Sequence, residues 1–115
     1  MESENTNDLS SQKSFSKESP NNLVTTKKLL AYFKISKEAL DMARDAFDPD
    51  RIETAKDFFN MAQCYYSDAK HFYNEKHDMV LAFAALNYAH GWLDAGARIG
   101  IFQVKDDRLF TVDSD

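Results

Sequence analysis

Cysteine is almost absent from this sequence of 115 residues, since Cys64 is the only one. A single cysteine cannot form an intrachain disulfide or a zinc site made of several thiolates, so neither can stabilise the fold. The sequence also lacks a phosphate-binding glycine loop, a zinc-protease motif, the Gly-x-Ser-x-Gly pattern of serine hydrolases and the Arg/His signature of HEPN helical ribonucleases. These absences favour a protein that is not an enzyme, and they leave catalysis open.

Long uncharged apolar runs are missing as well. The most apolar stretch, residues 79–104, carries Asn87, His90, Asp94 and Arg98 near its middle, and charged side chains are costly inside a membrane. The beginning of the sequence has no basic segment followed by an apolar run, the pattern of a signal peptide. We therefore expect a cytoplasmic protein with no membrane partner.

The net charge of −5 leaves little positive charge for binding nucleic acid. Four lysines make the first expected helix locally basic, and such a group is more typical of a solvated face than of a phosphate-binding surface. These residues are Lys27, Lys28, Lys34 and Lys37. We expect no nucleic-acid partner.

Apolar periodicity is also absent from residues 1–22, which hold six serines, four asparagines and one aromatic residue, Phe15. Such a segment cannot bury enough apolar surface to offset the entropy lost on ordering. We predict a disordered tail over 1–22, one folded domain over 23–112, and a short tail over 113–115.

The rest of the sequence has the period of helices, with apolar residues recurring every three or four positions. The segments 24–47, 50–74 and 79–102 are predicted helices. In the first, one apolar column is Tyr32, Ile35, Ala39, Met42 and Ala46, and its neighbour is Leu29, Phe33, Leu40, Ala43 and Phe47, interrupted by Ser36. In the second, the column is Ile52, Ala55, Phe59, Ala62, Tyr66, Ala69 and Tyr73, beside Phe58, Tyr65 and Phe72. In the third, Leu81, Ala85, Tyr88, Trp92, Ala95 and Ile99 run beside Ala82, Leu86, Ala89, Leu93, Gly96 and Gly100.

Short connections join these segments. Pro49 ends the first helix, and the second begins either at Asp48 followed by Pro49 or at Asp50 with Glu53 three residues later. Asp78 is a suitable cap for the third helix. Three helices of similar length with tight turns predict an all-α, antiparallel three-helix bundle.

Two features of the third segment and its continuation give further expectations. The column that ends in Gly96 and Gly100 predicts close approach of another helix backbone. Residues 108–112 have the composition of a strand but no partner strand in the sequence. We expect this short extended segment to lie against the bundle.

One polar stripe interrupts the third helix. Asn87, His90, Gly91, Asp94 and Arg98 fall within about 100° of one another on a helical wheel. Asp94 can pair with Arg98 or with His90, since both pairs have i,i+4 spacing. The stripe is a solvent-exposed face, a buried network that fixes helix register, or a binding site. The candidate partner- or ligand-binding residues are Asn87, His90, Asp94, Arg98 and Trp92.

Catalytic and metal-binding patterns are weak. Asp68 and His71 have half the spacing of a carboxylate-bundle metal motif, but no second copy follows. Cys64 and His71 are two helical turns apart, about 10 Å, which is too far for a nucleophile and its base. We assign no catalytic residue, no metal site and no cofactor.

The run 84–100, Ala-Ala-Leu-Asn-Tyr-Ala-His-Gly-Trp-Leu-Asp-Ala-Gly-Ala-Arg-Ile-Gly, resembles the signature of the archaeal domain of unknown function family 357. Tyr66-x-Asp68-Ala69-x-x-Phe72 and the Leu-Phe-Thr-Val sequence at 109–112 resemble the same family, so that the likeness covers about residues 55–112. Its most specific part is Tyr-Ala-x-Gly-Trp-Leu-Asp-Ala-Gly. His77 departs from the pattern by standing where a glycine is expected. The resemblance implies a compact helical fold and an archaeal, cytoplasmic origin, and it brings no catalytic residues.

Two functions fit these observations. The first is a non-enzymatic helical module that contacts a protein partner or a second copy of itself. The alternative is a small-molecule-binding protein or an enzyme that uses the polar stripe of the third helix.

Overall fold

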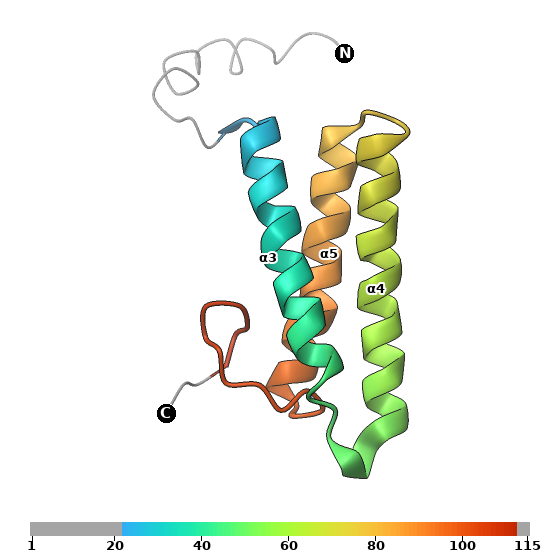
Figure 1. Cartoon of the computed structure of the whole chain (residues 1–115), viewed down its shortest axis with the longest axis vertical. Coiled ribbons are helices and arrows are strands. Elements are labelled where there is room, and N and C mark those ends of the chain that lie inside the picture. Colours follow the sequence, from blue (N-terminus) through green and yellow to red (C-terminus); the bar gives the residue numbers. More distant parts are fainter. Residues whose placement is uncertain (1–21, 113–115) are drawn as a thin grey trace, which may run out of the picture.

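The computed structural model describes residues 22–112. It contains three long helices, α3 (Thr26–Arg44), α4 (Ile52–Asn74) and α5 (Met79–Arg98), and a short 3₁₀ helix, η2 (Pro49–Arg51), before α4. The helices run down, up and down (Figure 1), so the predicted antiparallel three-helix bundle is confirmed. The tails predicted over 1–22 and 113–115 lie outside the described residues, apart from Asn22.

Side-chain caps fix where the helices begin. The Thr25 hydroxyl accepts the Lys28 N–H at 3.1 Å, and the Asp78 carboxylate accepts the Leu81 N–H at 2.9 Å. Of the two possible starts for the second helix, the chain uses Asp48, whose carboxylate accepts the Asp50 N–H at 3.0 Å in front of η2. Each bond satisfies a backbone donor that has no partner inside the helix.

Two helices end earlier than the sequence predicts. α3 ends at Arg44 instead of residue 47, and α5 ends at Arg98 instead of residue 102. The segments after them pair with each other, since the Asp48 N–H donates to the Ile101 carbonyl at 2.9 Å and the Gln103 N–H to the Ala46 carbonyl at 2.7 Å. Gly100, with φ of 83°, makes the turn that allows this pairing.

The predicted α4 column lies at the centre of the bundle, where Ala55, Phe59, Ala62 and Ala69 are buried. On α5 one of the two predicted columns is core, and of the other column only Ala85 is buried. Ala82, Leu86, Ala89 and Leu93 are buried, whereas Leu81, Tyr88 and Ile99 are exposed. α3 packs mainly on α5 and less on α4. The exposed Leu81, Tyr88 and Ile99 mark a side of α5 that no helix within residues 22–112 covers.

The C-terminal segment, residues 101–112, leaves the lower end of α5 and lies beside the lower part of α3 (Figure 1). Ile101, Phe102, Leu109 and Phe110 are buried, which confirms that this part of the chain lies against the helices. Residues 107–112 follow turns and bends. The close neighbour of Gly96 is the Phe102 ring, so the expected contact with another helix backbone is wrong at this position.

None of the helices within residues 22–112 combines the length and the apolar character needed to cross a membrane.

Candidate functional site

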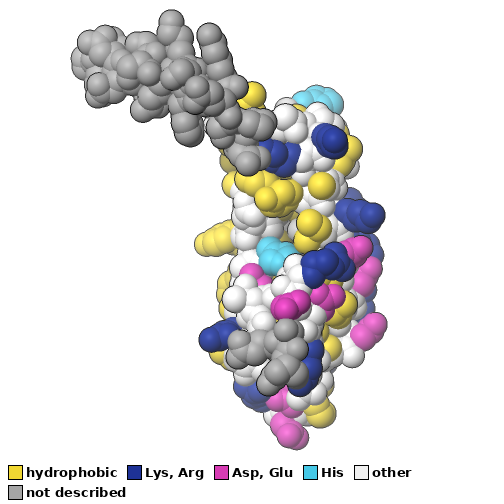
Figure 2. Space-filling view, turned by 90° about the vertical axis from the view of Figure 1, so that its left-hand side faces the viewer, with side chains coloured by type: hydrophobic (Ala, Val, Ile, Leu, Met, Phe, Trp, Pro, Cys, Tyr) yellow, Lys and Arg dark blue, Asp and Glu magenta, His cyan; other side chains and the backbone are white. Residues whose placement is uncertain are grey.

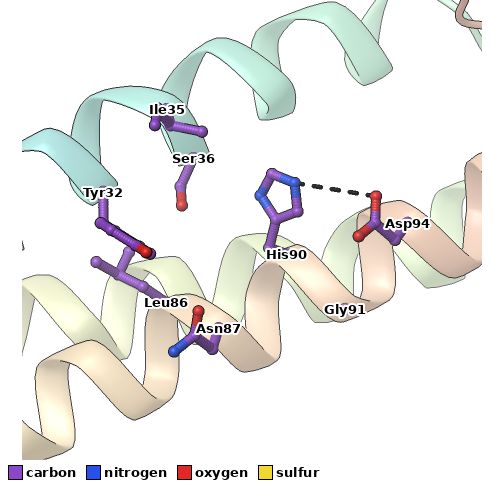
Figure 3. A pocket seen from close by; sticks show the side chains of 8 residues that line it. All are labelled: Tyr32, Ile35, Ser36, Leu86, Asn87, His90, Gly91 and Asp94. Atoms are coloured by element: carbon purple, nitrogen blue, oxygen red, sulfur yellow. Dashed lines mark ion pairs between the residues drawn. The ribbon is translucent and has the colours of Figure 1, made fainter. Parts of the chain in front are cut away.

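A pocket of about 340 Å³ lies between α3 and α5. Its walls come from two helices that are far apart in sequence, and Figure 3 shows them facing each other across the opening. We call it the α3–α5 pocket, and its lining residues are Tyr32, Ile35 and Ser36 from α3 and Leu86, Asn87, His90, Gly91 and Asp94 from α5. Three of the five predicted site residues, Asn87, His90 and Asp94, therefore meet here.

His90 is held by the C-terminal segment. Its Nε2 lies 2.6 Å from the Leu109 carbonyl oxygen, and the Phe110 ring lies 6.4 Å from the imidazole, centroid to centroid. A carbonyl oxygen only accepts, so Nε2 carries the hydrogen of this bond. In neutral imidazole the lone pair is then on Nδ1, and that nitrogen is turned toward Ser36 and Tyr32 (Figure 3).

Asp94 binds the same segment. Its Oδ1 accepts the Thr111 N–H at 2.9 Å and lies 3.9 Å from His90 Nε2. The predicted His90–Asp94 pair is thus brought near, but each member has a closer partner in the C-terminal segment. Within residues 22–112, Arg98 forms no ion pair with Asp94, because the Asp94 carboxylate is turned toward the C-terminal segment.

Ser36 is the site residue that sequence reasoning did not select. Its side chain is only 3% exposed, and its hydroxyl has no hydrogen-bond partner among residues 22–112. Figure 3 shows the hydroxyl directed into the pocket. The available signal was its position as the single polar interruption in an apolar column of the first helix.

Ser36, His90 and Asp94 are the residue types of a catalytic triad, but they are not connected as one. A triad needs a serine bonded to a histidine whose second nitrogen donates to the acid. Here no hydrogen bond joins Ser36 to His90, and His90 Nε2 is bonded to the Leu109 carbonyl. The pocket can offer hydrogen bonds to a ligand, and it lacks a connected proton path.

Trp92 lies on the opposite side of α5. Its ring meets Phe58 of α4 edge to face at 5.1 Å, and Tyr88 meets Tyr65 at 4.5 Å. These rings border two shallow, largely apolar hollows. We call this surface the outer face and define it by Phe58, Tyr65 and Phe72 of α4 and Leu81, Tyr88, Trp92 and Ala95 of α5.

The other residues considered for catalysis or metal binding lie outside the α3–α5 pocket, and Asp68 lies at the margin of the outer face. Cys64, Asp68 and His71 are exposed on α4. Over residues 22–112, no three histidine, cysteine, aspartate or glutamate side chains are grouped closely enough to hold a metal ion.

A family model described as "Protein of unknown function (DUF357)" matches residues 31–102, a range that includes every residue lining the α3–α5 pocket. No curated protein and no solved structure matches the chain.

Proposed function

The chain belongs to the DUF357 family, whose description names no activity, and we propose that it binds a small molecule in the α3–α5 pocket without transforming it. This is the small-molecule alternative that the polar stripe raised. The volume of about 340 Å³ lies at the lower end of ligand pockets in proteins, which span about 300–1,000 Å³.

The observation that carries this proposal is the buried Ser36 hydroxyl. A hydroxyl taken out of water without a hydrogen bond costs about 1–3 kcal/mol. Ser36 has no partner among residues 22–112 and lies at the wall of a pocket whose opposite wall presents Asn87, His90 and Asp94. A ligand that bonds to Ser36 gives this buried hydroxyl a partner and gains affinity by doing so.

The test compares ligand binding by the full chain and by Ser36→Ala. A small-fragment library is screened by ¹⁵N-edited NMR, and bound fragments are expected to shift the amide signals of Ser36, Asn87 and His90. Ser36→Ala is expected to weaken their binding about tenfold or more, the equivalent of about 1.4 kcal/mol. Ser67→Ala, at an exposed position of α4, is the matched control and is expected to bind normally. Equal binding by Ser36→Ala and its control would refute the proposal.

A second candidate function is contact with another protein through the outer face. Tyr88 is 60% exposed and Leu81 46% exposed, although both have the spacing of core residues. Phe58, Tyr65 and Phe72 repeat every seven residues, the spacing of helices that pack nearly parallel to their neighbours. An apolar surface with this pattern is typical of a helix-packing interface.

For this surface we propose a second copy of the chain as the occupant. Asp68 lies in one of its hollows, and Arg98 is an exposed cation on α5. A twofold arrangement can place Asp68 of one copy against Arg98 of the other. Sedimentation velocity is expected to show a dimer that Tyr88→Lys dissociates and Lys56→Ala, on the exposed side of α4, leaves intact. A monomer at about 100 µM, far above a micromolar dissociation constant, would exclude this second candidate.

We also propose an archaeal, cytoplasmic setting, as the family resemblance implies. A lone cysteine supports a reducing compartment. The net charge of −5 supports the absence of a nucleic-acid partner.

A further inference from the structure

The polar groups of the α3–α5 pocket favour some ligands over others, because several of them accept hydrogen bonds and one is a carboxylate. Resting on the proposed small-molecule function, we infer that its ligand is a small ring compound that presents N–H or O–H donors and carries no negative charge. Three features lead to this chemistry: the tautomer of His90, the free oxygen of Asp94, and a lining that holds no lysine or arginine.

The Leu109 carbonyl decides what His90 offers. Because Nε2 donates to that oxygen at 2.6 Å, the neutral ring presents only a lone pair on the pocket side. This acceptor requires an N–H or O–H of the ligand. A backbone carbonyl oxygen can only accept a hydrogen bond, so it keeps the hydrogen of the neutral His90 ring on Nε2. The preference of Nδ1 for a ligand donor therefore follows from the fold.

Asp94 adds a second acceptor. Its Oδ1 holds the Thr111 N–H, and its Oδ2 has no partner among residues 22–112. The Ser36 hydroxyl can donate or accept, and the Asn87 amide can do both. His90 Nδ1 and Asp94 Oδ2 therefore only accept hydrogen bonds, whereas Ser36 and Asn87 can also donate them.

The charges around the opening also disfavour a negatively charged ligand. No lysine or arginine lines the pocket. On the face shown in Figure 2, acidic side chains lie just below a histidine at mid-height, with basic side chains beside them. Arg108, which precedes Leu109 in the C-terminal segment, pairs with Glu38 at 3.2 Å. An anion entering the pocket would meet Asp94 without a cation to offset it.

The remaining walls are mainly apolar, apart from the Tyr32 hydroxyl. The side chains of Tyr32, Ile35 and Leu86 form the part of the pocket away from Asp94. They can cover the faces of a ring while its edge turns toward Ser36, His90 and Asp94. A pocket of about 340 Å³ holds one such ring with a small substituent.

Four matched probes test this inference: benzamide, benzamidine, N,N-dimethylbenzamide and benzoate. They share one ring and differ in N–H donors and in charge. Titrations of the full chain at about pH 8, where an ordinary histidine is neutral, are followed by ¹⁵N-edited NMR. Benzamide and benzamidine are expected to shift the Ser36 and His90 signals and to bind at least about tenfold more tightly than the other two.

Two variants separate the groups involved. Asp94→Asn keeps the size of the side chain and is expected to lower benzamidine affinity several-fold more than benzamide affinity. Asp68→Asn, on exposed α4, is expected to change neither. A long-range ¹H–¹⁵N spectrum of the imidazole is expected to show His90 protonated on Nε2 and unprotonated on Nδ1, whether or not a probe is present.

The outcomes distinguish this inference from the function on which it rests. If benzoate or N,N-dimethylbenzamide binds the pocket as tightly as benzamide, and Ser36→Ala weakens all of them, the pocket binds ligands but the inferred ligand class is wrong. A proton on His90 Nδ1 with none on Nε2 would also refute the inferred class. If none of the four probes shifts the pocket signals, the inference is refuted, and the fragment screen with Ser36→Ala then decides the function separately.

Discussion

Single residues carry most of the functional evidence in this protein. The polar stripe on α5 was visible in the sequence because Asn87, His90 and Asp94 interrupt an apolar helix. The structure gives these residues different tasks, since His90 and Asp94 bind the backbone of the C-terminal segment while Asn87 faces the pocket alone. Ser36, on another helix, completes the site.

His77, which departs from the family pattern, has a backbone conformation that favours glycine. The resemblance places glycine at this position, and His77 has φ of 53°, in the left-handed region that side chains rarely occupy. His77→Gly is expected to stabilise the protein by about 0.5–1 kcal/mol in urea denaturation. Glu75→Gly, at φ of −99°, is the control and should lower the stability. A less stable His77→Gly variant would show that this strain is absent.

Asp94→Ala tests whether the stripe is a buried charged network. Asp94 is partly exposed and accepts one backbone hydrogen bond, from Thr111, so its loss is expected to cost about 0.5–1.5 kcal/mol of unfolding free energy. Asp68→Ala, at an exposed position without such a bond, should cost less than about 0.5 kcal/mol. A cost of about 3–5 kcal/mol would indicate a buried charged network, and no cost would mean that the Thr111 bond does not contribute.

Whole helices were easier to predict than their surroundings. The α4 column was predicted correctly, because Ala55, Phe59, Ala62 and Ala69 repeat with one clear period and all are buried. α5 has two apolar columns, and periodicity cannot tell which of them faces the core. The early ends of α3 and α5 depend on backbone pairing between residues 46–48 and 101–103, a long-range contact that leaves no periodic signal in either segment.

Ala89→Leu tests the packing assigned to α5. Ala89 is fully buried, and extra methylene groups in a filled core usually cost about 1–3 kcal/mol. Urea denaturation is expected to show a loss of that size. Ala84→Leu, at an exposed position on the same helix, should change the stability by less than about 0.5 kcal/mol. Equal stability of the two variants would mean that α5 is rotated about its axis.

At the scale of the whole molecule, the C-terminal segment joins α3 to α5. Arg108 pairs with Glu38 of α3 at 3.2 Å, while the Leu109 carbonyl and Thr111 N–H bind α5. The segment thus spans the same two helices that form the pocket. The sequence predicted that residues 108–112 pack on the bundle. It could not predict contacts to His90 and Asp94, because residues in turns have no periodic pattern that shows which helix residues they meet.

Acid is expected to weaken the connection between η2 and the bundle. The Asp50 N–H first, and the Arg51 side chain second, lower the pKa of Asp48 below its ordinary value. The ionised carboxylate therefore stabilises the fold above about pH 4, the value for an unfolded chain. That contribution is lost as the pH falls through the lower pKa of the folded state.

Urea denaturation at a series of pH values tests this linkage. Between about pH 4 and pH 2 the parent should lose more stability than Asp48→Asn, which keeps a cap oxygen but no charge. The comparison with the variant removes the contribution of Asp41, whose pKa is lowered by Lys37 and Arg44. Parallel curves for parent and variant would contradict the role assigned to Asp48.

The central claim is that the α3–α5 pocket binds a ligand through Ser36. A crystal structure of the full chain soaked with benzamide tests it most directly. We expect density for the ring between Tyr32 and Leu86, with the amide within hydrogen-bond distance of the Ser36 hydroxyl and His90 Nδ1. An empty pocket, with the Ser36 hydroxyl bonded to a backbone carbonyl of α3, would contradict the claim.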